Sequence, residues 1–377
     1  MLLRAIPVVR QSSSTTVLGD GPVRILACLL ALLLAQAAHA LEIVDQRGHT
    51  ISLAKPPERL VFMPIPAPST FITIDGSDKR VVGMNAFSAS AMREGIFGKM
   101  FPDFTRIKTN VVMGGGDASN FSPNVEAILS LRPDLVFQWA NAGSDVISVL
   151  DRTGLPVLGM RAGTWDDFAA YVRIMGLVAG KEGRAEALLD RQLKTRRDLE
   201  AALASIPMSE QPRVLYFNRA VNLLRVSGQG SFNDFYIRLA GGRNAAGDNP
   251  PISTVTIEQV LTWNPQVVLL GNFDTALPAD IYDDPRWQSV DAVRNRRVYR
   301  MPLGGYRWDP PSQESSLTWL WLAGLFHPER LNVNLRDEMR DWFGFLYNNQ
   351  LTDSEIDQIL FVKENRDSVG YDRYAKQ

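Results

Sequence analysis

The residues best suited to chemistry in this chain form a short run of rings and a guanidinium group. Tyr306, Arg307 and Trp308 follow one another between Gly305 and Pro310. Aromatic faces pack against flat, partly apolar molecules, and arginine pairs with carboxylate or catecholate oxygens. The run therefore predicts a binding site for a flat, anionic metal chelate, although Trp308 can instead pack against the helix that follows.

Sequence motifs of common catalysts are missing from this chain. It has no G-x-S-x-G elbow, no H-E-x-x-H and no Walker A sequence. After removal of a leader, His49 and His327 are the histidines that remain, and they lie far apart in the sequence. We therefore expect no enzymatic activity, no cofactor and no multi-histidine metal site, while carboxylate ligation of a bare cation stays open.

A passage that occurs twice indicates how the binding residues are positioned. Residues 124–141 read NVEAILSLRPDLVFQWAN, and residues 256–273 read TIEQVLTWNPQVVLLGNF. Aligned without a gap, the copies share a glutamate, Glu126 or Glu258, then an apolar pair and a proline that opens an apolar run. Such a unit is typical of a helix followed by a buried parallel strand. Two copies predict two similar α/β lobes with a cleft between them.

The first copy predicts its own local structure. Val125, Ile128 and Leu129 fall at helical spacing and predict a buried stripe. Pro133 cannot continue the helix and favours extended geometry at Arg132. The apolar run that follows then forms a strand that is buried on both faces.

A long helical pattern separates the two copies. Residues 181–205 are rich in Ala, Leu, Arg and Glu and contain no proline, which predicts a stiff connecting helix. The predicted fold is α/β, with two Rossmann-like lobes of parallel sheets, one long connecting helix and a ligand cleft between the lobes. The predicted organisation is a signal peptide (1–40), an N-terminal lobe (41–180), the linking helix (181–205), a C-terminal lobe (206–330) and C-terminal helices (331–377).

Two further segments of the first lobe carry specific predictions. Residues 42–53 predict a hairpin with Arg47 and Gly48 at its turn. Residues 86–107 are mixed in character and predict irregular structure near the cleft.

Composition and the N-terminus indicate where the protein works. The net charge of −1 over 377 residues gives no electrostatic basis for binding nucleic acid. Arginines precede an apolar run at residues 25–34, and Ala38-His39-Ala40 offers a cleavage site, as in a secretory signal peptide. Cys28 lies inside the apolar run, so lipoprotein anchoring through it is the lesser interpretation. We expect a secreted, periplasmic protein.

The order of several segments resembles one known family. RLVFM at 59–63, VEAILSLRPDLV at 125–136, LAGGRNAA at 239–246, TIEQVLTWNPQVVLL at 256–270 and WDPPSQESSLTWLWLAGLFHPE at 308–329 are similar to segments of ABC-importer substrate-binding proteins. The resemblance is to the class for iron–siderophore complexes, cobalamin and haem, in which one long helix joins two lobes. It covers nearly all of residues 42–365.

The resemblance implies a function and a set of contact residues. In that family an exposed glutamate on each lobe docks onto arginines of the membrane permease, and Glu126 and Glu258 occupy the matching positions. It also implies a monomer that carries a small metal chelate. The rule that ligands of open α/β sheets bind beyond the carboxyl ends of strands selects the remaining candidates. The predicted ligand-binding residues are Trp139, Arg161, Asn218, Arg219, Asn272, Tyr306, Arg307 and Trp308.

Alternatives remain open for these predictions. Trp139 is also compatible with a core position, and Arg161 or Arg219 with a surface ion pair. The cargo can instead be cobalamin, an oxyanion such as molybdate, or haem with Tyr306 as an axial donor. A secreted α/β hydrolase is the alternative from a different class, but it does not explain the duplicated unit.

Overall fold

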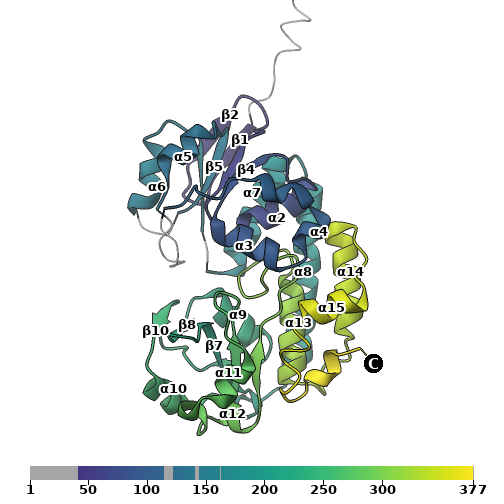
Figure 1. The fold of residues 1–377 in the computed structure, drawn as a ribbon. Coiled ribbons are helices and arrows are strands. Elements are labelled where there is room, and N and C mark those ends of the chain that lie inside the picture. The colour runs from purple at the N-terminus through teal and green to yellow at the C-terminus, as the bar shows by residue number, and fades with distance from the viewer. Residues whose placement is uncertain (1–40, 114–121, 141–143, 162, 377) are drawn as a thin grey trace, which may run out of the picture. The chain divides into compact units, whose positions relative to one another are not determined.

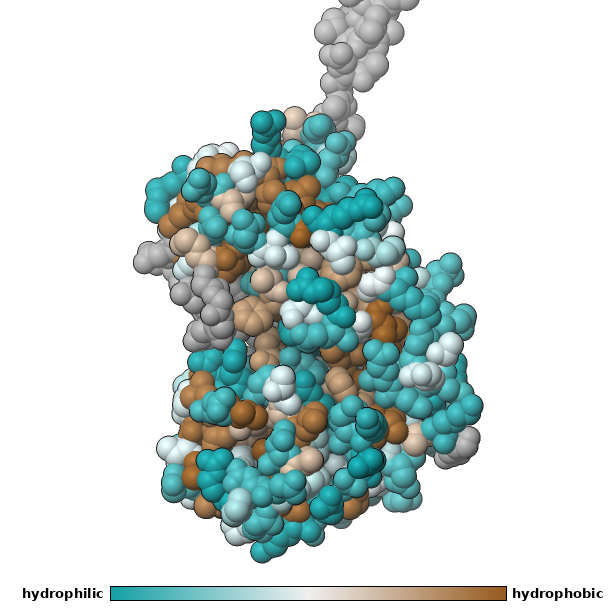
Figure 2. All heavy atoms as spheres, viewed as in Figure 1, coloured by the Kyte–Doolittle hydropathy of each residue, from teal (hydrophilic) through white to brown (hydrophobic). Residues whose placement is uncertain are grey.

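The computed structural model describes residues 41–113, 122–140, 144–161 and 163–376 (Figure 1). The predicted signal peptide at residues 1–40, with Cys28, lies outside the described residues. Within the described ranges, no helix combines the length and the apolar character needed to cross a membrane. On the face drawn in Figure 2, apolar side chains reach the surface in separate patches among hydrophilic ones.

The described chain opens with the predicted hairpin. Strands β1 (Leu41–Val44) and β2 (Thr50–Leu53) pair antiparallel. Gly48 has a left-handed φ of 84°, which suits the turn where it was expected. The hairpin prediction is therefore confirmed.

The first parallel sheet has the strand order β4-β3-β5-β6. Side chains from alternate positions of its central strands enter two different cores, as expected for a sheet covered on both faces. Phe62 and Phe137 pack with α2 and α7 on one face, whereas Val61 and Val136 pack with α5 and α6 on the other. The strands are β3 (Leu60–Phe62), β4 (Val81–Met84), β5 (Leu135–Trp139) and β6 (Val157–Met160), and the helices are α2 (Ala67–Asp75), α3 (Ala86–Glu94), α4 (Phe97–Met100), α5 (Val125–Ser130), α6 (Ser144–Asp151) and α7 (Trp165–Ala179), with a 3-10 turn at Pro102–Arg106.

The second sheet has the order β10-β8-β7-β11-β12, and β9 pairs with β7. Its centre is parallel, because β11 runs parallel to both β7 and β12. Short antiparallel strands extend it at one edge, where β8 pairs with β7 and β10 pairs with β8. The strands are β7 (Arg213–Arg219), β8 (Arg225–Val226), β9 (Arg243–Asn244), β10 (Ser253–Thr254), β11 (Val267–Leu270) and β12 (Val298–Arg300), and the helices are α9 (Phe232–Leu239), α10 (Ile257–Trp263), α11 (Pro278–Asp283) and α12 (Asp291–Arg294), with 3-10 turns at Met208–Glu210 and Pro285–Trp287.

One long helix lies between the two sheets in the sequence. Helix α8 (Glu182–Leu203) has 22 residues and agrees with the predicted connecting helix at 181–205. It packs against α7 and against α13 (Ser315–Phe326), an almost wholly buried helix. The chain ends with α14 (Leu335–Tyr347), α15 (Asp353–Ile359) and a 3-10 turn at Tyr371–Tyr374. The α/β fold with two parallel sheets is as predicted, and the lobe boundaries stay predictions.

Three local predictions are wrong. Residues 86–107 are largely helical, in α3, α4 and the 3-10 turn, and the Asn85 side chain caps α3 by accepting from the amide of Phe87. Leu129 is 45% exposed, because Ile128 is the one residue of the short helix α5 that is fully buried. Arg132 has a φ of 48°, so the chain leaves α5 through the left-handed region instead of an extended residue.

Candidate functional site

The loop that follows β12 carries the densest group of predicted ligand residues. A backbone bridge joins Leu303 to Arg307, and the amide of Gly304 donates to the carbonyl of Tyr306 at 3.0 Å. Gly304 and Gly305 allow the backbone of this loop to pass close to the side chain of Glu314. A Cβ on Gly304 would stand 2.0 Å from Glu314 Oε2, and one on Gly305 would stand 2.8 Å from Oε1.

The side chain of Glu314 packs against this loop and fixes its position, a role that its place in the sequence did not predict. Its side chain is fully buried at the start of α13 and accepts hydrogen bonds from Trp308 Nε1 at 2.8 Å and from the Tyr347 hydroxyl. Burial raises the pKa of Glu314 to about 7, although these donors act to lower it. A glutamate beside an apolar helix was the available signal, but its burial cannot be read from its neighbours.

Tyr306 joins the loop to the first sheet. Its hydroxyl donates to the carbonyl of Ile65 at 2.7 Å, and its ring is fully buried. Burial raises the pKa of Tyr306 above its usual value. Ile96 strengthens the same junction, because its amide donates to the carbonyl of Gly304 at 3.0 Å. In this structure Tyr306 therefore holds the loop against the segment that follows β3.

Arg307 is a buried cation with incomplete hydrogen bonding. Its side chain is 4% exposed, and Nη2 lies 3.6 Å from a carboxylate oxygen of Glu94. Nη1 donates to the carbonyl of Phe87 at 3.1 Å, and the guanidinium lies 4.9 Å from the centre of the Phe273 ring. Nε has no hydrogen-bond partner within the described part of the chain. Nε can therefore donate a hydrogen bond to an anionic ligand.

A second buried network fixes the other end of the loop. Asp309 is 1% exposed and accepts from the Tyr216 hydroxyl and from the amide of Asn272, both at 2.9 Å. The Asn272 side chain donates to the carbonyl of Pro302 at 2.9 Å. Burial, together with the charge of Asp309, raises the pKa of Tyr216 well above its usual value. Asn272 thus positions the loop here, and Asp309 is a support that the sequence analysis missed.

The other predicted ligand residues are less closely grouped. Trp139 is 7% exposed and packs edge-on against Tyr171, with ring centres 6.5 Å apart. The Arg161 side chain is 59% exposed and lies 3.9 Å from Asp167. Trp308 is fully buried against Glu314. Asn218 and Arg219 are half-buried at the end of β7. The structure thus groups Asn272 with residues 306–308 and leaves Arg161 on the surface.

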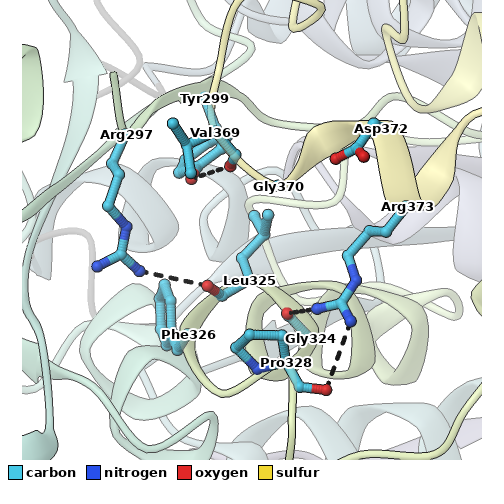
Figure 3. A pocket seen from close by; sticks show the side chains of 10 residues that line it. All are labelled: Arg297, Tyr299, Gly324, Leu325, Phe326, Pro328, Val369, Gly370, Asp372 and Arg373. Carbon is cyan, nitrogen blue, oxygen red and sulfur yellow. Dashed lines mark hydrogen bonds between the residues drawn. The ribbon is translucent and has the colours of Figure 1, made fainter. Parts of the chain in front are cut away.

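A hollow of about 520 Å³ lies elsewhere, beside the C-terminal end of α13 (Figure 3). The arginines that line it donate hydrogen bonds to backbone carbonyls at that helix end. Arg297 donates to the carbonyl of Leu325 at 3.3 Å, and Arg373 donates to those of Gly324 and Pro328. Cations at a helix C-terminus stabilise it. None of the ten lining residues is a predicted ligand residue, and the arginine contacts support a structural role for this hollow.

The two predicted docking glutamates occupy equivalent positions. Glu126 and Glu258 are the second residues of α5 and α10, and both are exposed. Asn124 and Thr256 cap these helices through side-chain oxygens. A hydrogen bond from Thr256 lowers the pKa of Glu258. Each carboxylate is thus presented to solvent in the first turn of a capped helix.

Among the residues that the structure describes, no three His, Cys, Asp or Glu side chains gather closely enough to hold a metal ion. Two parallel sheets, a long helix between them in the sequence and supported loops at strand carboxyl ends together define a solute-binding protein of the two-lobe type.

Comparison with known proteins agrees with this class. A model of the periplasmic binding protein family matches residues 118–303. The crystal structure of a periplasmic solute binding protein from Veillonella parvula is 32% identical, covers 86% of this chain and 98% of its own, and has a TM-score of 0.75. The molybdate-binding protein MolA of Haemophilus influenzae is 25% identical over 346 residues, which are 86% of this chain and 95% of MolA. A cobalamin-binding protein of Halobacterium salinarum is 30% identical over 222 residues, 54% of this chain and 57% of its own length.

The chain belongs to the periplasmic binding protein family, the solute-binding components of ABC importers. Membership places it in the periplasm or outside the cell and pairs it with a membrane permease. The relatives reported above are solute-binding proteins by name.

Proposed function

We propose that this protein is a monomeric periplasmic carrier that captures an anionic metal complex, a ferric chelate of the siderophore type, and delivers it to an ABC permease. The observation that carries the proposal is the buried Arg307 side chain, whose Nε donor has no partner in the described ranges. A buried donor without a partner costs about 1–3 kcal/mol, more when it is charged. An anionic ligand removes that cost by accepting from Nε.

The surroundings of Arg307 suit a complex with both charge and apolar faces. The backbone carbonyl of Phe87, in the first turn of α3, and the ring of Phe273, which follows β11, both contact the guanidinium. Among the residues that the structure describes, Glu94 is the acidic side chain paired with it, at 3.6 Å, and the Glu94 side chain is 52% exposed. The ion pair between Arg307 and Glu94 is long and half-exposed, so it is weaker than a short, buried pair. A carboxylate or catecholate oxygen of the ligand can therefore displace Glu94 from Arg307.

Molybdate is a second candidate cargo, and a specific observation favours it. The molybdate-binding relative is matched over 95% of its length. The cobalamin-binding relative is matched over 57%, and the Fe(3+)-citrate-binding protein of Bacillus subtilis over 56%. Haem gains no support from Tyr306 as an axial donor, since that hydroxyl is already used by Ile65 and its pKa is raised.

A panel titration tests the cargo. Tryptophan fluorescence of the mature protein is followed while ferric hydroxamate, ferric catecholate, ferric citrate, cobalamin, haemin or molybdate is added. Saturable quenching by one ferric chelate, with none by the metal-free carrier, supports the primary proposal, and saturation by molybdate supports the second. Silence across the panel would overturn both. Steady hydrolysis of generic esters by clean protein would instead favour the hydrolase alternative.

Paired variants test the proposed binding residue. Arg307→Gln should weaken binding of the active cargo at least tenfold, because the charged donor is lost. Arg286→Gln is the matched control, since Arg286 is exposed and its ion pair within the described ranges is with Asp284. Equal affinities of the two variants would contradict the role of Arg307.

Docking to the permease is proposed to use Glu126 and Glu258, each paired with an arginine of the membrane subunits. Replacement of both glutamates by alanine should leave cargo affinity unchanged and lower uptake of the bound cargo. Equal loss of cargo affinity would count against this division of roles.

A further inference from the structure

A second buried arginine, Arg300, lies at the carboxyl end of β12. It is in register with Leu270, the last residue of the parallel strand β11, and it is 8% exposed. Its Nε has no hydrogen-bond partner within the described residues, and burial lowers the pKa of the group from its usual value. Because burial of a cation costs free energy, the hydrogen bonds that Arg300 does make must offset that cost.

The guanidinium of Arg300 joins the two ends of the loop that follows β11, residues 271–276. Its Nη1 donates to the carbonyl of Gly271 at 2.8 Å and to that of Ala276 at 3.1 Å. Gly271 is the first residue after β11, and Ala276 lies two residues before α11. One nitrogen atom therefore holds the start and the end of this loop together.

The backbone of Arg300 is itself fixed by Asn365, from the segment after α15. Asn365 is fully buried, its Oδ1 accepts from the Arg300 amide at 2.7 Å, and its Nδ2 donates to the Arg300 carbonyl at 3.1 Å. The Asn365 side chain thus takes the place of a neighbouring strand at this edge of the second sheet. Arg300 therefore holds the loop from a backbone position that cannot easily shift.

Phe273 is the residue of this loop that contacts the proposed binding residue. Its half-buried ring has its centre 4.9 Å from the Arg307 guanidinium. Asn272, directly before it, is held by the buried network described above, and Asp274, directly after it, accepts from the amide of Ala276 at 3.0 Å. A loop that is closed at its base keeps the ring in one orientation before cargo arrives, which lowers the entropic cost of binding.

We infer that Arg300 is a positioning residue of the cargo site, which holds the loop 271–276 closed and thereby keeps the Phe273 ring against Arg307. This inference rests on the proposed carrier function. In this role Arg300 does not touch the cargo but acts through Phe273. A purely structural Arg300 would instead support the stability of the second sheet, and its loss would leave the contact between Phe273 and Arg307 unchanged.

Arginine side-chain NMR of the mature protein without cargo tests this contact, because an aromatic ring shifts the resonance of a nearby N–H group. The Nε–H resonance of Arg307 is identified by its absence from Arg307→Lys, and Phe273→Leu gives its position without the ring. Arg300→Met removes the donors and should move the resonance towards the Phe273→Leu position. Arg300→Lys should leave it near its original position, since an ammonium group can donate to both carbonyls. Arg297→Met is the matched control and should leave it unmoved, because Arg297 lies directly before β12 and bonds a carbonyl of α13 instead.

The fluorescence titration with the ferric chelates and molybdate tests the consequence for binding. Arg300→Met should weaken binding of the cargo that saturates the unaltered protein about tenfold, and Arg300→Lys should weaken it much less. If circular dichroism shows that Arg300→Met does not fold, Arg300→Gln takes its place, since its shorter side chain cannot bridge both carbonyls.

An unmoved Arg307 resonance in the folded Arg300 variant would overturn the inference, and so would a moved resonance with unchanged cargo affinity. An equal shift in Arg297→Met would also overturn it, because the effect would then not be specific to the loop. A moved resonance in a protein that binds nothing in the panel would refute the proposed cargo and leave the link between Arg300, Phe273 and Arg307 intact.

Discussion

Arg132 and Asn264 have the same unusual backbone conformation at matching positions of the duplicated unit. Their φ angles are 48° and 41°, and each residue comes directly before the proline that opens the next segment. An arginine then binds the end of each helix. Arg59, directly before β3, donates from Nη2 to the carbonyl of Leu131 at 2.7 Å, and Arg213, the first residue of β7, donates from Nη2 to that of Asn264 at 2.8 Å. The duplication therefore extends from residue types to backbone geometry and helix-end contacts.

Substitutions at these two turns should show that the left-handed conformation is required. Arg132→Val and Asn264→Val should each lower the free energy of unfolding by about 1–2 kcal/mol, because β-branched residues are strained at positive φ. Arg132→Gly and Asn264→Gly are the controls and should cost little, since glycine adopts this conformation freely. Urea unfolding with unchanged m-values measures the difference. Equal stability of the valine and glycine variants would contradict the assignment.

The glycines above Glu314 lead to a prediction about the binding loop. Gly304→Ala should lower the free energy of unfolding by about 2–3 kcal/mol and weaken cargo binding, because its Cβ would stand 2.0 Å from Glu314 Oε2. Gly183→Ala is the matched control. Gly183 lies in α8, and apart from its chain neighbours and the backbone of its own helix no atom lies within 4 Å of an added Cβ, so this change should stabilise by about 0.5–1 kcal/mol. Calorimetry and the fluorescence titration measure both, and a stable, fully binding Gly304→Ala protein would refute the packing described.

Neighbouring residues of α5 should differ sharply in their contribution to stability. Ile128→Ala should lower the free energy of unfolding by about 2–4 kcal/mol, because Ile128 is fully buried. Leu129→Ala should change it by less than about 1 kcal/mol, because Leu129 is 45% exposed. Chemical denaturation of the two variants side by side decides the point, and a large loss for Leu129→Ala would mean that it belongs to the core.

The sequence predicts the fold well because the fold depends on periodicity. Alternation between a helical stripe and a fully apolar strand appears in both copies of the duplicated unit, and the long proline-free segment predicts α8. The prediction fails where the local sequence pattern does not show how deeply a side chain is buried. Leu129 fits the apolar stripe, but a helix as short as α5 turns too few positions inward to bury it.

The candidate site is less predictable, because it depends on contacts between distant residues. The strand-end rule selects Arg307, but it cannot reveal the contacts with Phe87 and Glu94, which are more than 200 residues away in the sequence. Likewise, Asp309 and Glu314 have ordinary sequence surroundings, and only the fold buries their carboxylates beneath the loop.

Glu314 should make the stability of this protein depend on pH between about 4.5 and 7. Its pKa is raised from 4.5 to about 7, chiefly because burial disfavours the charged carboxylate. In this window the native protein retains a proton that the unfolded chain releases. The stabilisation from this group is therefore complete below about pH 4.5 and is lost as pH rises through about 7.

Replacement of Glu314 by glutamine isolates that effect, because the amide resembles the protonated acid in shape and does not titrate. The shift in pKa corresponds to roughly 3 kcal/mol at most. Between pH 5 and pH 8, the unaltered protein should therefore lose up to that much stability relative to Glu314→Gln, as measured by urea unfolding at each pH. Other titrating groups are common to both proteins and cancel in the difference. Parallel pH profiles would show that the carboxylate beneath Trp308 is already ionised at pH 5, and that its hydrogen bonds outweigh its burial.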